Sequence, residues 1–348
     1  AATNANGGTY VAYLFAHNND DGEFGPDSDA DIIKCGYYTG SGVSGKEIDI
    51  GFEPQFLIVK RADGTRDWDM TDNMRGWAGS ASQVSLKPNA SEAESSSNVL
   101  ELMPTGWRIN TTTITFNAED ANYIYIAIRR GPMAVPENAD DVFDVAARTG
   151  ASGNQGAYRS GFTVDMAFHK VVNSSINPYE IGSRLTQGKS MKTNANDSES
   201  TTSDQQYDYM DGWNSETSAA STKYAWMWKR APNYFDVVAY TGDGTGVRTI
   251  DHNLGVAPEM MWIKGRNATM SWIVYHAGLG NDYVMRLEQT SAATSGSSLY
   301  WNGTDPTDSV WTINSNLNTS GRNYIAYLFA SLDGVSKVGS YTGNGSST

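Results

Sequence analysis

The tripeptide Tyr240-Thr241-Gly242 closes a short apolar run, and the same tripeptide recurs at Tyr38-Thr39-Gly40 and at Tyr341-Thr342-Gly343. A degenerate copy, Arg148-Thr149-Gly150, lies between the first two. Successive copies are about 100 residues apart, a spacing too long for a solenoid repeat and typical of small tandem domains. We expect each copy to end the first strand of a domain, where the glycine lets the chain turn.

A second landmark, a strand rich in aromatic residues, recurs with the same period. It appears at Tyr10–Ala16, Tyr123–Ile128, Tyr224–Trp228 and Tyr324–Ala330. In the last of these both alternating sets of positions are apolar, which is typical of a strand buried on both faces. Two landmarks in a constant order predict a repeated domain.

The positions of the recurring segments along the chain give the predicted domain boundaries. Three whole units are expected at residues 32–130, 141–230 and 234–331, the second being divergent. Residues 1–31 should hold the end of a preceding repeat plus an acidic loop, and residues 332–348 the start of a following repeat, so we expect the polypeptide to be longer than this sequence. Short linkers that contain proline favour a semi-rigid rod of units.

Composition within each unit predicts an all-β fold. Short runs of Val, Ile, Tyr, Trp and Phe are bounded by Gly, Asn, Asp and Pro, and helical periodicity is nearly absent. Units of this size predict tandem antiparallel β-sandwich domains of jelly-roll or lectin-like type. Trp107, Trp213 and Trp311 hold similar places in the three units, so we expect them in the cores.

Charge and cysteine content exclude several classes of function. The 348 residues carry a net charge of -14, which would repel nucleic acid. The single cysteine, Cys35, excludes an internal disulfide framework. No apolar run approaches the length of a membrane span, so membrane insertion is not expected.

No catalytic constellation stands out, and the protein is predicted not to be an enzyme. The four histidines do not show the spacing of a zinc site, and no nucleophile elbow or phosphate-binding loop is present. A polysaccharide-degrading tailspike would need clustered carboxylates, and the sequence singles out no such pair.

One acidic segment could bind calcium. Asp27, Asp29 and Asp31 copy the first half of an EF-hand loop, but Ile32 occupies the place of the turn glycine and Tyr38 that of the bidentate glutamate. A solvated acidic loop between domains is the alternative, and no other cofactor is expected.

Two tryptophans are candidates for ligand contact. Trp77 and Trp301 lie beside glycine and polar residues and have no clear counterparts in the other units. We therefore expect them to be exposed, where an indole ring could stack on a sugar.

The repeats resemble those in structural proteins of marine tailed bacteriophages, cyanophages especially. The likeness is carried by the segments 32–40, 51–61 and 338–346, and the second unit departs most from it. It implies a virion structural protein, a tail-fibre or surface-appendage segment with a role in host adhesion, located on the surface of the extracellular particle. It also implies a homotrimer that contacts other virion proteins and a glycan or protein of the host-cell surface.

Two other functions stay open. The chain could be an array of carbohydrate-binding, lectin-like modules, which overlaps with adhesion if a fibre grips a surface glycan. It could also be a capsid or tail decoration protein without receptor binding.

Overall fold

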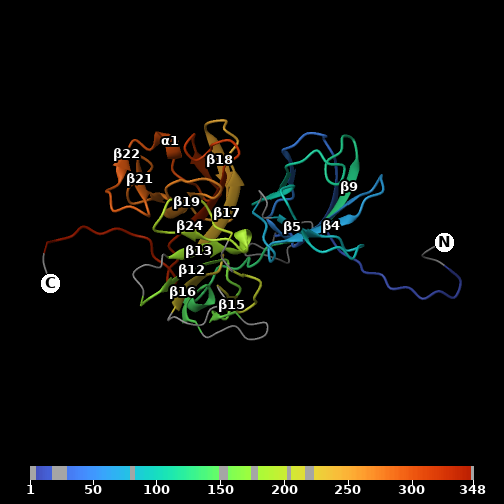
Figure 1. Ribbon diagram of the computed structural model, residues 1–348, viewed down its shortest axis with the longest axis horizontal. Helices are drawn as coiled ribbons and strands as arrows, with labels where there is room; N and C mark the ends of the chain where they lie inside the picture. The colour runs from blue at the N-terminus through green and yellow to red at the C-terminus, as the bar shows by residue number, and fades with distance from the viewer. Residues whose placement is uncertain are drawn as a thin grey trace.

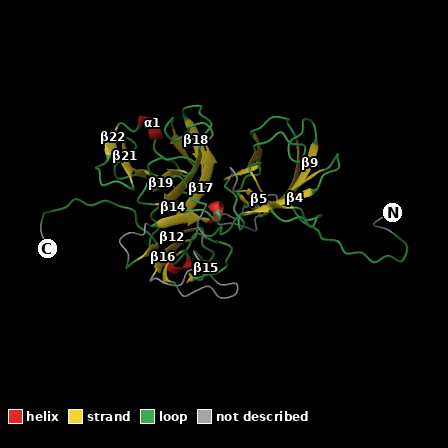
Figure 2. Cartoon of the chain, viewed as in Figure 1, coloured by secondary structure: helices red, strands yellow, loops and turns green. Residues whose placement is uncertain are grey.

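The computed structural model describes most of the chain, namely residues 5–17, 30–78, 83–148, 156–173, 179–201, 205–215 and 223–345. Within these ranges the regular structure is almost entirely β-strand (Figure 2). The helical segments there are short: η1 (Ala139–Asp141), η2 (Arg184–Thr186) and α1 (Ser298–Trp301). The predicted all-β fold class is confirmed.

The first unit pairs its first strand with its last. Its strands are β1 (Ile33–Thr39), β2 (Lys46–Asp49), β3 (Pro54–Arg61), β4 (Trp68–Asp72), β5 (Gln83–Leu86), β6 (Ser95–Ser97), β7 (Leu100–Met103), β8 (Gly106–Ile109) and β9 (Asn122–Arg129). The main sheet has the order β1-β9-β3-β4-β5-β6, and a second sheet has the order β2-β8-β7. Trp107 of the second sheet meets Tyr125 of the first edge-on, with ring centroids 5.0 Å apart.

The third unit repeats this topology. Its strands are β17 (Phe235–Thr241), β18 (Arg248–Asp251), β19 (Met260–Gly265), β20 (Ile273–His276), β21 (Tyr283–Arg286), β22 (Thr294–Ser295), β23 (Val310–Ile313) and β24 (Asn323–Phe329). The main sheet runs β17-β24-β19-β20-β21-β22 beside a β18-β23 pair, all antiparallel.

The second unit is a shorter version of the same plan. Its strands are β10 (Phe143–Ala147), β11 (Tyr158–Arg159), β12 (Met166–Val171), β13 (Glu180–Ser183), β14 (Met191–Lys192), β15 (Gly212–Trp213) and β16 (Lys223–Trp228). The sheet order β10-β16-β12-β13-β14 again places the last strand between the first and the next long one. The three aromatic-rich landmarks of the whole units therefore coincide with the central strands β9, β16 and β24.

Packing explains why the tyrosine of the tripeptide recurs. Tyr38 stacks on Tyr123 of the neighbouring strand at a centroid distance of 5.0 Å, and Tyr240 stacks on Tyr324 at 4.9 Å, both pairs tilted by 11°. The Tyr38 hydroxyl donates to the carbonyl of Phe116 at 2.8 Å. Each tyrosine thus joins the first strand, the last strand and the turn that precedes the last strand.

The glycine is required by close backbone approach, which corrects the expectation that it serves a turn. A Cβ atom on Gly40 would lie 2.0 Å from the carbonyl oxygen of Ala118, and one on Gly242 would lie 2.2 Å from that of Thr319. Neither glycine is among the residues with positive φ. A side chain at either position would therefore push the end of the first strand away from the turn that precedes the last strand.

The cores contain the expected tryptophans. Trp107, Trp213 and Trp311 are fully buried, each inside its own unit, so the prediction that they are core residues is confirmed.

The units pack around one another, and the expectation of a rod is wrong. Figure 1 shows the second and third units together on one side and the first unit beside them. The amide of Thr241 in the third unit donates to Oε1 of Glu101 in the first at 2.7 Å, and the amide of Trp77 donates to the carbonyl of Leu185 in the second at 3.1 Å. One hydrophobic cluster extends through all three units, because their sheet faces are apolar on both sides.

The end segments are extended in the described ranges. Tyr10–Ala16, the copy of the β24 landmark, forms no strand there, and its Tyr13 and Leu14 side chains are exposed. At the other end Tyr341 is exposed as well. The two termini lie at opposite ends of the molecule (Figure 1).

Candidate functional site

The ends of the three units meet at a buried ion-pair cluster. Arg230, directly after β16, donates to both carboxylate oxygens of Glu53, at 2.8 and 2.6 Å, and to Oδ1 of Asp236 at 2.7 Å. Glu53 immediately precedes β3, and Asp236 is the second residue of β17. The three side chains are nearly inaccessible to solvent. We call them, together with Arg130 and Asn253, the junction cluster.

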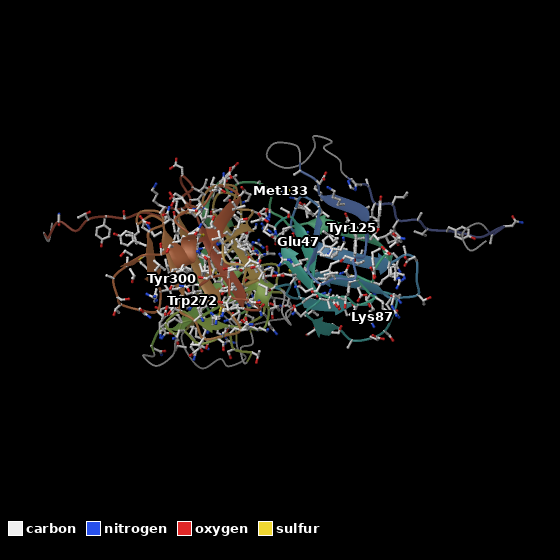
Figure 3. The ribbon with its side chains drawn as sticks, turned by 90° about the horizontal axis from the view of Figure 1, so that it is seen from above. Glu47, Lys87, Tyr125, Met133, Trp272 and Tyr300 are labelled. Carbon is white, nitrogen blue, oxygen red and sulfur yellow. The ribbon has the colours of Figure 1, made fainter. Side chains whose placement is uncertain are left out.

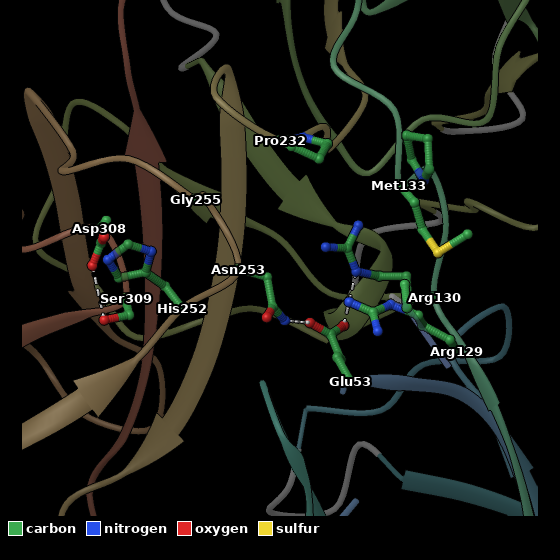
Figure 4. Close-up of a pocket in the computed structure, with 12 residues that line it drawn as sticks. Glu53, Arg129, Arg130, Met133, Pro232, His252, Asn253, Gly255, Asp308 and Ser309 are labelled. Atoms are coloured by element: carbon green, nitrogen blue, oxygen red, sulfur yellow. Dashed lines mark hydrogen bonds and ion pairs between the residues drawn. The ribbon is translucent and has the colours of Figure 1, made fainter. Parts of the chain in front are cut away.

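The other two members add an ion-pair contact from Arg130 and hydrogen bonds from Asn253 to the carboxylates. Arg130 Nε lies 3.3 Å from Glu53 Oε1, and Arg130 Nη2 lies 3.7 Å from Asp236 Oδ1. Asn253 donates its amide nitrogen Nδ2 to Glu53 at 3.3 Å and its backbone N–H to Asp236 at 2.9 Å. Figure 4 shows Arg130 and Asn253 approaching Glu53 from opposite sides.

Neighbouring charges shift the pKa values of Asp236 and Arg230 in the cluster. Burial by itself would raise the pKa of Asp236, but Arg230 and Arg130 outweigh it and hold the pKa below its ordinary value. Burial likewise disfavours the charged guanidinium of Arg230, but Asp236 and Glu53 raise its pKa instead. Asp236 and Arg230 therefore form a charged pair at neutral pH, and the contacts of Arg230 with Asp236 and Glu53 join the three units.

A polar cavity of about 520 Å³ opens beside the cluster, between the first and third units (Figure 4). Met133, seen from above in Figure 3, belongs to the loop that lines it. The carboxylate of Glu53 in its wall is already occupied by Arg230, and His252 uses both ring nitrogens, with Leu254 N and with the carbonyl of Thr307. These polar groups therefore serve the junction.

A second hollow, of about 530 Å³, lies between the second and third units and has a different character. We call it the aromatic groove. Its apolar side chains are Phe168, Tyr179, Trp226, Trp262 and Leu287, and its polar ones are Thr193, Asn194, Glu288, Gln289 and Thr290.

The aromatic rings of the groove are held by their sheets. Phe168 and Trp226 are cross-strand partners whose rings stack at 5.1 Å and 26°. Tyr179, just before β13, lies 6.1 Å from Trp226, and the Lys170 ammonium sits over its ring at 5.4 Å. Trp262 of β19 forms the facing wall and packs on Phe329 at 5.0 Å.

This combination suits a ligand with both apolar and hydroxyl-rich surfaces. The half-buried rings offer flat apolar faces, while amide, hydroxyl and carboxylate groups surround them. A sugar ring has a C–H face that packs on an aromatic ring and hydroxyls that need donors and acceptors.

The two tryptophans that the sequence singled out are not in this groove. Trp77 and Trp301 are 0% and 1% exposed, and their indole N–H groups donate to the carbonyls of Leu100 and Tyr283. The expectation that they are exposed is wrong, because segments distant in the sequence cover both rings: Trp77 belongs to the hydrophobic cluster that extends through the three units, and Trp301 belongs to the core of the third unit. The groove tryptophans lie instead in apolar strands, where only the alternation of side chains shows that they face away from the core of their own unit.

The predicted calcium segment is only partly described. Asp27 and Asp29 lie outside the described residues, and the Asp31 carboxylate is 3.3 Å from the Lys34 ammonium. The residues that the structure describes contain no group of three potential metal ligands. Calcium binding by this segment stays a prediction.

None of the helices in the described ranges is both long enough and apolar enough to cross a membrane.

Comparison with known sequences identifies a family without an assigned role. No curated protein matches the chain. A family described as a domain of unknown function (DUF7483) matches residues 1–132 and 138–348, so that both matched segments together span nearly the whole sequence. The chain belongs to this DUF7483 family.

Proposed function

We propose that this protein is a rigid, non-enzymatic binding protein that holds a carbohydrate chain in the aromatic groove. The groove carries this proposal. A role in host adhesion, as a tail-fibre or other surface appendage of a virion, rests on the resemblance of the repeats to phage structural proteins, and it is part of the same proposal.

The aromatic rings of the groove are already held in place, which supports its assignment as a binding site. Phe168 and Trp226 stack on each other and Trp262 packs on Phe329, so a ligand need not immobilise these rings. Rings already held in place bind at a lower entropic cost than free ones. The exposed Tyr179 at the mouth adds a further flat surface.

The two walls come from different units, and their mutual position is held by polar contacts. Arg266 of the third unit binds Glu199 of the second at 2.8 Å, and the Trp272 indole donates to the carbonyl of Lys192 at 2.8 Å. Figure 3 shows Trp272 on the side of the third unit that faces the second. A groove built across two fixed units keeps its width, as a site for an extended polymer requires.

The proposal is tested on a glycan array with the full chain, followed by calorimetric titration of any hit. Tyr179→Ala should weaken binding about tenfold, because one stacked ring contributes on the order of 1 kcal/mol. Tyr283→Ala is the matched control, since both tyrosines are 40% exposed but Tyr283 lies outside the groove. Trp262→Ala should abolish binding while the melting temperature shows that the chain is folded.

Three outcomes would contradict the proposal. An array without hits would favour a decoration protein that binds no receptor. Equal effects of the Tyr179 and Tyr283 substitutions would place the ligand elsewhere. Release of shortened sugar products from a bound polysaccharide would contradict the non-enzymatic assignment.

A further inference from the structure

The main sheet of each unit has an outer face, which is turned away from the core of that unit. The three outer faces can be compared position by position, because the first and last strands of each unit pair in the same register. The pair Ile33–Ile128 in the first unit corresponds to Phe143–Trp228 in the second and to Phe235–Phe329 in the third. In the first unit the outward positions of β1, β9 and β3 carry eight apolar side chains, which are Ile33, Cys35, Tyr37, Phe56, Ile58, Ile124, Ile126 and Ile128. The same face also carries Thr39, Asn122 and Lys60, and it continues on β4 with Trp68, Met70 and Asp72.

The outer face of the third unit is covered over most of its width. Phe235, Val237 and Tyr327 are at most 1% exposed. They belong to the hydrophobic cluster that also contains Leu102 of the first unit and Leu185 of the second. The chain itself therefore supplies the cover for this sheet.

The outer face of the second unit is covered over part of its width. Met166 and Ile181 are buried in the same cluster, whereas Val145 on the edge strand β10 and Tyr224 on its neighbour β16 are 44% and 38% exposed. Trp226 of this face and Trp262 of the third unit's outer face line the two walls of the aromatic groove. The second and third units thus pair equivalent sheet faces with each other.

In the part of the chain that the structure describes, the outer face of the first unit has no such cover. None of its eight apolar side chains on β1, β9 and β3 belongs to a hydrophobic cluster there, and Tyr37 and Ile124 are 80% and 42% exposed. These three strands place Lys60 and no carboxylate on the face, although the chain as a whole has a net charge of -14, and the one acid that β4 adds, Asp72, is paired with Arg75 at 2.6 Å. A contiguous apolar patch of this kind marks an interaction surface.

We propose that the outer face of the first unit is a self-association surface that receives the same face of a second copy of this chain. Within one chain, the outer face of the second unit already packs against the equivalent face of the third unit. An equivalent face from a second copy is therefore the partner that fits the outer face of the first unit. Two copies related by a two-fold axis would bring the faces together sheet on sheet, with every contact made twice. Two acidic chains can approach there because β1, β9 and β3 place no carboxylate on the face and Asp72 of β4 is neutralised by Arg75.

Sedimentation or light scattering of the full chain, from about 1 to about 100 µM, measures the assembly. The test variant is Tyr37→Lys with Ile124→Lys, two exposed cross-strand neighbours whose replacement leaves the core untouched. The matched control is Val145→Lys with Tyr224→Lys, at comparably exposed positions on the outer face of the second unit. We expect the natural chain and the control to have the mass of two copies and the test variant that of one, with melting temperatures that agree.

Cys35, the single cysteine, provides a second readout because it lies on the proposed surface. Its reaction with a thiol reagent should slow at least about tenfold between dilute and concentrated natural protein, and not in the test variant. A monomeric natural chain at the highest concentration, a mass of three copies, or a test variant that stays dimeric would each overturn the proposal. Sugar binding in the aromatic groove is measured separately and does not depend on this surface.

Discussion

Replacing Glu53 by Ala tests whether the junction cluster holds the three units together. The carboxylate accepts two hydrogen bonds from Arg230 and one from Asn253, and it lies beside Arg130. All of these partners come from other parts of the chain, since Arg230 is 177 residues away along the sequence. Its removal leaves two guanidinium groups facing a single buried carboxylate, Asp236.

The expected loss follows from the burial of the cluster. Breaking a buried ion pair by removing one partner costs about 3 to 5 kcal/mol, because the other charge is left without compensation. Glu53 and Arg230 are 5% and 2% exposed, so water cannot replace the missing contact. We expect the free energy of unfolding to fall by this amount and the first unit to separate from the others first.

Urea unfolding measures the loss, and small-angle scattering measures the separation as an increased radius of gyration. Glu47→Ala is the control, because this glutamate also binds an arginine, Arg108, at 2.6 Å, but is 50% exposed. An exposed pair contributes less than about 1 kcal/mol. In Figure 3 Glu47 lies on the side of the first unit that faces the third.

A double-mutant cycle separates the pair from general packing. Glu53→Ala and Arg230→Ala together should lose less than the sum of the two single losses, with a coupling of about 1 to 3 kcal/mol. Equal losses for Glu53→Ala and Glu47→Ala, or additive losses in the cycle, would refute the idea that the cluster holds the units.

Three further outcomes are expected from the packing and charges. Gly242→Ala should destabilise the fold by more than about 2 kcal/mol, because its Cβ would meet the Thr319 carbonyl, while Gly339→Ala, with open space around it, should be neutral in the same unfolding assay. Burial raises the pKa of Asp69 from its ordinary value of about 4 to about 6, so folding becomes less favourable as the pH rises between these two values; Asp69→Asn should stabilise the protein at pH 7 by about 1 kcal/mol, and the gain should vanish below about pH 4 in a pH series of urea titrations. Trp301→Phe should cost about 1 kcal/mol through the lost hydrogen bond to Tyr283, measured by thermal unfolding, and an unchanged stability would contradict its structural role.

Much of the fold could be predicted because its signals are local. Alternation of apolar residues and the bounding glycines identify strands, and the recurring tyrosines mark the first and last strands of the first and third units. The role of the glycine could not be predicted in detail, since the carbonyl that crowds Gly40 belongs to Ala118, far along the chain. The candidate site was missed for a related reason. A tryptophan in an apolar strand, such as Trp226, and one beside a turn, such as Trp77, differ in exposure only after distant segments have packed.

The repeat, the all-β class and the core tryptophans can be read from the amino-acid sequence, because each of these depends on the pattern of side chains within one unit. What covers the second face of each sheet follows from the packing of the units. Alternation shows that both faces are apolar, but it does not say whether an outer face meets another unit, as around Tyr327, or lies open, as at Ile124. That choice depends on contacts such as Glu53 with Arg230, which join residues far apart in the chain and leave no periodic trace in the sequence.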